Sequence, residues 1–309
     1  GGLLFNFFSV LFGLLITTSL IFSGAQKALA ALAVDAGTNK ITNHQVSQIA
    51  TVTGTPPPIS FAWTKVSGPG NITFGTPDAK DTTISADQDG SYVLKLTAND
   101  GTDDYFGTTD FVWDTTAPTI ASITSSATSP GILKIGDTIS FILTPEQKEA
   151  GASVSGSYNG QVLSWTTADS GITYTATYTV HSGDADQTTP LQITGVVITD
   201  AAGNTSNPFS GSDVQKTINA NAPHAPCLDP VTSPVNTSSQ TITGSADANS
   251  LVTISGGSST VSEQLTGGAT HFSILVPLNI NATNNLSVTA TDAAGNVSSP
   301  STATIVQDS

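Results

Sequence analysis

The chain has 309 residues, with 20 Asp against 3 Glu, 8 Lys, no Arg and no Met, and its formal net charge is −15. Neutralising phosphates requires clustered cations, so this acidic composition excludes nucleic acid as a partner. Thr, Val, Asn, Asp and Gly are abundant while the strong helix formers are scarce, which predicts an all-β fold. The single cysteine, Cys227, excludes an intramolecular disulfide bond, so apolar cores alone must stabilise the domains.

The amino-terminal segment Leu3–Phe22 is free of charge and largely apolar. Its length matches the ~20 residues that span a bilayer. The stretch Ala28–Ala33 then contains two overlapping small-x-small signals for signal peptidase. We predict that residues 1–33 are a signal peptide, or alternatively a membrane anchor that crosses the bilayer through residues 3–22. Because neither a Met nor a basic segment precedes the apolar run, we expect it to be incomplete at its amino end. The remainder of the chain is expected to be exported, extracellular and at the cell surface.

One six-residue motif, Thr-Asp-Ala-Ala-Gly-Asn, occurs at Thr199–Asn204 and again at Thr291–Asn296, each time after an alternating apolar and polar run. A weaker relative lies at Thr97–Gly101, and the aspartates of the three copies are 100 and 92 residues apart. This interval is the length of one β-sandwich domain, and repetition at a fixed period indicates an array of modules. We predict serial Greek-key, Ig-like β-sandwiches in a rod, with domains at residues 34–116, 117–221 and 222–309.

In the first predicted module, Tyr92, Leu94 and Leu96 alternate with more polar positions, which is the period-two pattern of a half-buried strand. The Tyr92 hydroxyl is expected to bind a backbone group at a Greek-key corner. The Trp-x-x-x-Ser-Gly-Pro stretch at Trp63–Pro69 and the Gly-x-Tyr-x-Leu-x-Leu-x-x-x-Asp-Gly stretch at Gly90–Gly101 resemble the polycystic kidney disease (PKD) family of Ig-like sandwiches. The resemblance implies a spacer or adhesion module with no catalytic residues.

In the second predicted module, the run Ile172–Val180 alternates apolar residues with four threonines, so its apolar side, Ile172 included, is predicted to face the core. Asn159–Gly160 predicts a type I′ hairpin turn. The stretches Gly136–Thr144 and Ile198–Asn204 resemble the Ig-like repeats of large bacterial surface adhesins. This module is therefore expected to be a second Ig-like sandwich.

The third predicted module contains alternating runs at Leu251–Ser255, Phe272–Val276 and Asn285–Asp292, each with the pattern of a strand. The Thr-Gly-x-Ala motif at Thr243–Ala246 precedes a short strand and is similar to that of another bacterial Ig-like family. The resemblance implies a further sandwich of the same general kind.

Catalysis is not expected in this chain. The four histidines are spread along the sequence, and no nucleophile motif, Gly-rich phosphate loop or zinc-ligand spacing occurs. Aspartate is so frequent that scattered carboxylates do not define a glycosidase pair. We predict that the chain is not an enzyme and contributes no catalytic residue.

Calcium is the one cofactor that the composition favours, because carboxylate and amide oxygens are the ligands it prefers. The candidate ligands, in chain order, are Asp100, Asp103, Asp104, Asp114, Asp200 and Asn204. The first four are expected to gather around the first module junction, where like charges repel unless a cation lies between them. The last two are expected near the end of a sandwich. The alternative is that these residues only close β-turns through their own side-chain hydrogen bonds.

Two classes of function remain open from the sequence. In the first, the chain is part of a cell-surface adhesin or stalk whose serial modules act as a spacer. In the second, the modules are accessory domains of a secreted degradative enzyme whose catalytic domain lies elsewhere. Either class implies a ligand at a surface, a polysaccharide or a protein. An export signal that leads directly into repeats favours the surface protein.

Overall fold

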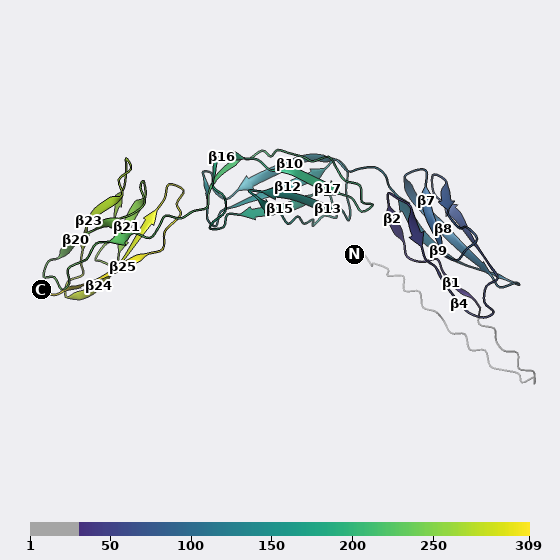
Figure 1. Cartoon of the computed structure of the whole chain (residues 1–309), viewed down its shortest axis with the longest axis horizontal. Coiled ribbons are helices and arrows are strands. Elements are labelled where there is room, and N and C mark those ends of the chain that lie inside the picture. The colour runs from purple at the N-terminus through teal and green to yellow at the C-terminus, as the bar shows by residue number, and fades with distance from the viewer. Residues whose placement is uncertain (1–30) are drawn as a thin grey trace, which may run out of the picture.

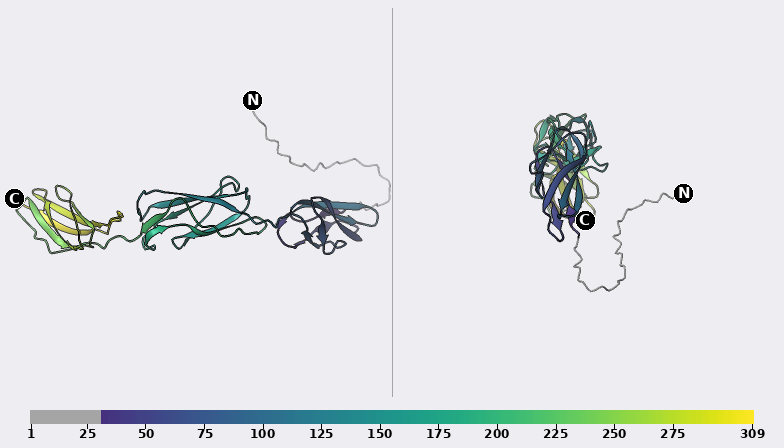
Figure 2. Two further views of the ribbon diagram at one scale, coloured as in Figure 1. Left: turned by 90° about the horizontal axis from the view of Figure 1, so that it is seen from above. Right: turned by 90° about the vertical axis from the view of Figure 1, so that its right-hand side faces the viewer.

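The computed structural model describes residues 31–309, so the predicted apolar segment at residues 3–22 lies outside the described part of the chain. Every described element is a β-strand, which confirms the all-β prediction. Three β-sandwiches follow one another in a line (Figure 1), and views from two further directions keep them on one axis (Figure 2). Within residues 31–309, no helix is long and apolar enough to cross a membrane.

The first module is built from β1 to β9. Its four-stranded sheet has the order β2-β9-β8-β5, a three-stranded sheet has the order β3-β7-β6, and β1 pairs with β4. The core includes Trp63, Tyr92 and Leu94. The Tyr92 hydroxyl donates to the carbonyl of Gln88 and accepts from the amide of Gly70, which confirms the predicted tyrosine corner. The strands are β1 Ala33–Asp35, β2 Lys40–Thr42, β3 Val46–Gln48, β4 Thr51–Thr53, β5 Ser60–Ser67, β6 Ile72–Phe74, β7 Thr82–Ala86, β8 Gly90–Asn99 and β9 Asp104–Trp113.

The second module is built from β10 to β18 in three sheets, ordered β10-β12-β15, β11-β18-β16 and β14-β13-β17. In its core the ring of Tyr158 packs against Phe141 at a tilt and against Tyr178 edge-on. Asn159 and Gly160 have φ angles of +49° and +78°, as the predicted type I′ turn between β13 and β14 requires. The strands are β10 Ile120–Ala127, β11 Leu133–Lys134, β12 Thr138–Pro145, β13 Ser153–Tyr158, β14 Gln161–Val162, β15 Tyr174–Thr179, β16 Gln187–Leu191, β17 Thr194–Thr199 and β18 Lys216–Asn219.

The third module is built from β19 to β25 in two sheets, ordered β19-β20-β23 and β22-β21-β24-β25. Their inner faces enclose a core that includes Val252, Phe272 and Leu286. Alternate residues along β23 and β24 are buried, so the period-two pattern of the sequence is realised. The strands are β19 Cys227–Leu228, β20 Ser239–Ser245, β21 Leu251–Ser255, β22 Val261–Gln264, β23 His271–Pro277, β24 Ala282–Thr291 and β25 Ser301–Gln307.

One predicted strand face is wrong at its first residue. The tyrosines and the alanine of β15 are buried as predicted, but Ile172 lies before the strand and is 53% exposed. The reason is a local turn, in which the carboxylate of Asp169 accepts the backbone amides of Ile172 and Thr173 at 3.0 and 2.9 Å. These bonds draw the chain away from the sheet, so the alternation begins only at Tyr174.

Candidate functional site at the module junctions

The repeated six-residue motif folds into the same turn in the second and third modules. The amide of Asp200 donates to the carbonyl of Asn204 at 3.0 Å, and the amide of Asp292 donates to the carbonyl of Asn296 at 3.0 Å. In each turn one aspartate oxygen accepts the backbone amide of the asparagine, at 2.8 and 2.9 Å. The glycine before each asparagine has a φ near +90°, a backbone conformation that other residues rarely adopt. The motif therefore specifies one backbone geometry.

We call the end at which a module faces the module before it in chain order its leading pole, and the opposite end its trailing pole. The leading pole of the first module is the end that faces away from the second module. The Asp200–Asn204 turn follows β17 and lies at the leading pole of the second module. The Asn204 amide nitrogen donates to the other oxygen of Asp200 at 2.9 Å and to the backbone carbonyl of Asp114 at 2.8 Å. Its amide oxygen accepts from the amide nitrogen of Asn43 at 2.9 Å. Because Asn43 and Asp114 belong to the first module, one side chain joins the two modules.

The second junction repeats this arrangement with the third module's turn. The Asn296 amide nitrogen donates to the aspartate of its own turn at 2.9 Å and to the backbone carbonyl of Asn219 at 3.0 Å. Its amide oxygen accepts the backbone amide of Ile135 at 2.9 Å. The side chain of Asn219 also donates to Asp292 at 3.1 Å. Asn219 and Ile135 lie at the trailing pole of the second module, so both junctions use the same asparagine of the motif.

Some of these junction groups are buried and others, Asn204 among them, are half-buried. Asn296 is 4% exposed and Asp200 is 9% exposed. A satisfied hydrogen bond contributes about 0.5–1.5 kcal/mol net, whereas leaving a buried polar group without its partner costs about 1–3 kcal/mol. Bending a junction would break several bonds at once, so the bonds oppose rotation of one module against the next. We call each set of bonds an asparagine clasp.

The first junction also concentrates negative charge. Burial raises the pKa of Glu149, and the nearby charges of Asp200 and Asp114 raise it further. Glu149 is half-buried in the loop after β12, at the same pole as the turn. These carboxylates influence one another, yet among residues 31–309 no three carboxylate, thiol or imidazole groups are close enough to hold a metal ion together. The carboxylates whose charges gather at this junction are Asp114, Glu149 and Asp200, and they do not form a ready-made metal site.

Three of the candidate calcium ligands lie elsewhere. Asp100, Asp103 and Asp104 form the hairpin between β8 and β9, whereas Asp114 follows the opposite end of β9. A ten-residue strand separates them, which at ~3.3 Å per residue is about 30 Å. The predicted gathering of these aspartates around the first junction is therefore wrong, because antiparallel pairing sends the hairpin to the leading pole.

The hairpin aspartates make the turn bonds that were the alternative to metal binding. One oxygen of Asp100 accepts the backbone amides of Thr102 and Asp103, both at 2.9 Å, and these bonds hold the pKa of Asp100 below its ordinary value. Asp104 accepts the side-chain amide of Asn99 at 2.7 Å. At the junction, by contrast, the structure brings together Asp114, Asp200 and Asn204.

Several junction residues were not predicted from the sequence. Asn43, Glu149 and Asn219 carry no motif, and each reaches the junction only through the way the strands pair. Asn296 did carry a signal, because it occupies the same position as Asn204 in the repeated motif. Repetition of a polar residue with an identical turn around it is thus the sequence feature that could have identified both clasps.

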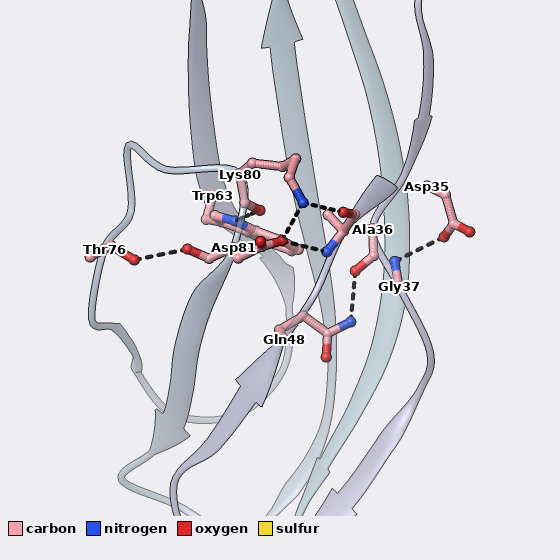
Figure 3. Close-up of polar contacts among 9 residues, drawn as sticks. Asp35, Ala36, Gly37, Gln48, Trp63, Thr76, Lys80 and Asp81 are labelled. Atoms are coloured by element: carbon pink, nitrogen blue, oxygen red, sulfur yellow. Dashed lines mark hydrogen bonds and ion pairs between the residues drawn. The ribbon is translucent and has the colours of Figure 1, made fainter. Parts of the chain in front are cut away.

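A separate surface groove of ≈ 460 Å³ lies in the first module beside β3 and β7. Figure 3 shows that polar groups beside it bind one another: the Gln48 amide donates to the carbonyl of Ala36 at 2.6 Å, and the Lys80 ammonium lies 2.7 Å from Asp81. The Lys80 ammonium and the backbone amide of Ala50 also hold the pKa of Asp81 below its ordinary value. Lys80, Asp81 and the backbone of Ala50 satisfy one another and brace the edge of the sandwich, whereas the buried amide oxygen of Gln48 has no hydrogen-bond partner among the described residues.

Comparison with protein families supports this architecture. Residues 37–112 match a family described as K319L-like, PKD domain, and residues 222–308 match a family described as a bacterial Ig domain. Both matches confirm the resemblances inferred for the first and third modules, and both families are non-catalytic modules. Modules of these two kinds in tandem are typical of surface or secreted proteins. No curated protein matches the chain.

Solved structures with a similar arrangement are distant. The fibronectin(III)-like modules of Clostridium thermocellum CbhA are 16% identical, with 62% of this chain and 94% of theirs covered and a TM-score of 0.35. A fragment of titin with three Ig domains is 11% identical, with 91% of this chain and 100% of the fragment covered and a TM-score of 0.35. TM-scores this low carry no argument about this chain.

Proposed function

We propose that this chain is a spacer in an exported surface protein, in which the three sandwiches act as a stiff stalk. The observation that supports it is the asparagine clasp, present with the same geometry at both junctions. A flexible linker would let neighbouring modules rotate freely. Two clasps, each anchored in a rigid turn, limit that rotation and keep the modules in line.

The chemistry of the modules fits a mechanical role. Each module has its own apolar core, and the residues that recur at both junctions are devoted to module contact. A stalk must separate its two ends by a length that persists under thermal motion. In this chain that length comes from the stacking of three sandwiches, and its persistence comes from hydrogen bonds at the poles.

Small-angle scattering on residues 31–309 tests the stalk. A compact chain of this length would have a radius of gyration of about 19 Å. We expect a value far above this and the profile of a rod. A value close to that of the compact chain would overturn the proposal.

The clasp is tested in the same measurement by combining Asn204→Ala with Asn296→Ala. We expect the radius of gyration to fall and the profile to broaden toward that of a flexible chain of modules, because each junction loses the bonds that oppose bending. The matched control combines Ala201→Ser with Ala293→Ser, which changes an exposed position of the same two turns and keeps both amides. If the asparagine variant scatters like the parent, the clasps do not provide the stiffness.

A further inference from the structure

The trailing pole of the third module presents the same two groups that hold Asn204 at the first junction. In the first module, Thr42 pairs in parallel with Trp113, and the next residues on the two strands are Asn43 and Asp114. The amide of Asp114 donates to the carbonyl of Thr42 at 3.1 Å. This pairing fixes both the Asn43 side chain and the Asp114 carbonyl at the end of the module.

The third module repeats this pairing with different residues. Val235 pairs in parallel with Gln307, and the next residues on the two strands are Asn236 and Asp308. The amide of Asp308 donates to the carbonyl of Val235 at 2.9 Å. Asn236 therefore occupies the position of Asn43, and Asp308 occupies the position of Asp114.

At the trailing pole of the third module, the Asn236 side chain and the Asp308 carbonyl have no hydrogen-bond partner in the described chain. Among residues 31–309, neither the side chain of Asn236 nor the backbone carbonyl of Asp308 makes a hydrogen bond, and both residues are exposed, whereas Asn43 and Asp114 are half-buried at their junction. Beside them lies a depression of ≈ 430 Å³. Thr232, Pro234, Val235, Asn236, Thr237 and Asp308 line it. Figure 1 places this pole at the far end of the array, away from the second module.

We propose that the trailing pole of the third module is a docking site for the Asp-x-x-Gly-Asn turn of another Ig-like module. The asparagine of the incoming turn accepts from the Asn236 amide and donates to the Asp308 carbonyl, as Asn204 does with Asn43 and Asp114. This inference rests on the pole geometry and does not require the stalk role.

The geometry also selects the partner. The incoming side chain must accept one hydrogen bond and donate another, which an amide does and a carboxylate does not. The hairpin at the leading pole of the first module carries carboxylates at Asp100, Asp103 and Asp104, so it would bring acceptors against the Asp308 carbonyl. A second copy of this chain is therefore not expected to dock through its first module.

The test extends the chain so that the docking can occur. Residues 31–308 are followed directly by a second copy of residues 115–219, which gives Asp308 the same continuation that Asp114 has. Cys227, the free cysteine, is changed to serine, and spin labels are placed at Ser262 and at the Ser155 of the appended copy, both exposed positions. Pulsed electron resonance then measures the distance distribution across the new junction. We expect a distribution as narrow as that between labels placed across the first junction.

Three variants separate docking from simple tethering. Asn236→Ala and, in the appended copy, Asn204→Asp should each cause loss of the narrow distribution, while Ala201→Ser in the copy should retain it. Melting of the variants checks folding, and Asn236→Ala is expected to leave it unchanged because that side chain makes no hydrogen bond within the described residues. A broad distribution in the unmutated extended chain, or a narrow one that survives Asn236→Ala, would overturn the inference. Scattering from residues 31–309 does not involve this pole, so failure here is distinct from failure of the stalk.

Discussion

At the scale of single residues, the side-chain amide is the group that the junctions need. The Asn204 amide nitrogen donates to the Asp200 carboxylate and to the Asp114 carbonyl, and the Asn204 amide oxygen accepts from the side-chain amide of Asn43. An aspartate at the same position would place its oxygens against those two acceptors with no proton to share. Charge is confined instead to the carboxylates around this amide, and Glu149 is the one whose pKa the junction raises.

The raised pKa of Glu149 predicts that the stability of the folded chain depends on pH. Its pKa in the folded chain lies above its value in the unfolded chain, so the ionised side chain destabilises the fold. Stability from this group is therefore fully present below the unfolded glutamate pKa of about 4.3 and is lost as pH rises through the folded pKa. We expect Glu149→Gln to raise the melting temperature near neutral pH and to have little effect at acidic pH.

Thermal melts across this pH range, with a chelator present to remove divalent cations, provide the measurement. The matched control is Glu146→Gln, an exposed glutamate of the same loop. If Glu149→Gln melts below the parent at neutral pH, the carboxylate is a stabilising group and the assigned repulsion is wrong.

At the scale of elements, β15 shows how a strand is fixed between core and solvent. Its tyrosines are 2% exposed, while the threonines between them face outward. The Tyr174 hydroxyl also donates to the backbone carbonyl of Glu149. This contact ties the core strand to the loop that carries the junction carboxylate, so packing in the second module supports the first junction.

Truncation of Tyr174 should therefore be costly. We expect Tyr174→Ala to destabilise the second module by about 3–5 kcal/mol, the range for removing a buried aromatic side chain. Thr175→Ser, on the solvent face of the same strand, should change stability little. Denaturant unfolding of the two variants checks this, and equal losses would mean that the strand's facing has been misassigned.

At the scale of the whole molecule, the two junctions differ in charge. The first collects Asp114, Glu149 and Asp200, whereas the second pairs Asp292 with the neutral amides of Asn219 and Asn296. A bound cation would therefore offset more repulsion between carboxylates at the first junction than at the second. Calcium binding there stays a prediction, with Glu149 added to the candidate set and the hairpin aspartates removed from this junction.

Calcium should stabilise the array if it binds at the first junction. A ligand that binds only the folded state adds RT ln(1 + [Ca²⁺]/Kd), or about 2.7 kcal/mol at a hundredfold excess over Kd. We expect the melting temperature of residues 31–309 to rise in millimolar calcium and to fall back with a chelator. Asp114→Asn combined with Glu149→Gln should abolish the shift.

The hairpin aspartates provide the control for calcium. Asp100→Asn combined with Asp104→Asn should leave the shift intact, because these residues lie at the other end of the first module. If calcium leaves the melting temperature of the unmutated chain unchanged, the fold tolerates the junction carboxylates without a cation.

Much of the fold could be predicted from local pattern. Alternation along β8, β15 and β24 predicted which faces are buried, because side chains of a strand point to opposite sides in turn. The Asn159–Gly160 turn and the Tyr92 corner followed from residues whose backbone or hydroxyl requirements are local. The misassigned Ile172 shows where this reasoning ends, since the nearby carboxylate of Asp169 forms a turn that delays the start of the strand to Tyr174.

The sequence by itself determined the all-β class, the array of modules and the repeated turn, because composition, periodicity and positive-φ glycines act over a few residues. Only the tertiary structure decided which polar groups meet. Asn43 reaches Asn204 across 161 positions of chain, and Ile135 reaches Asn296 across the same separation. Those contacts depend on strand pairing that brings distant residues to the two facing poles of one junction. Asp100, only 14 positions from Asp114, is instead carried to the opposite pole of the first module by an antiparallel hairpin. The separation of residues along the chain does not reveal which pole each will reach, and the clasps exist only where the sheets bring their members together.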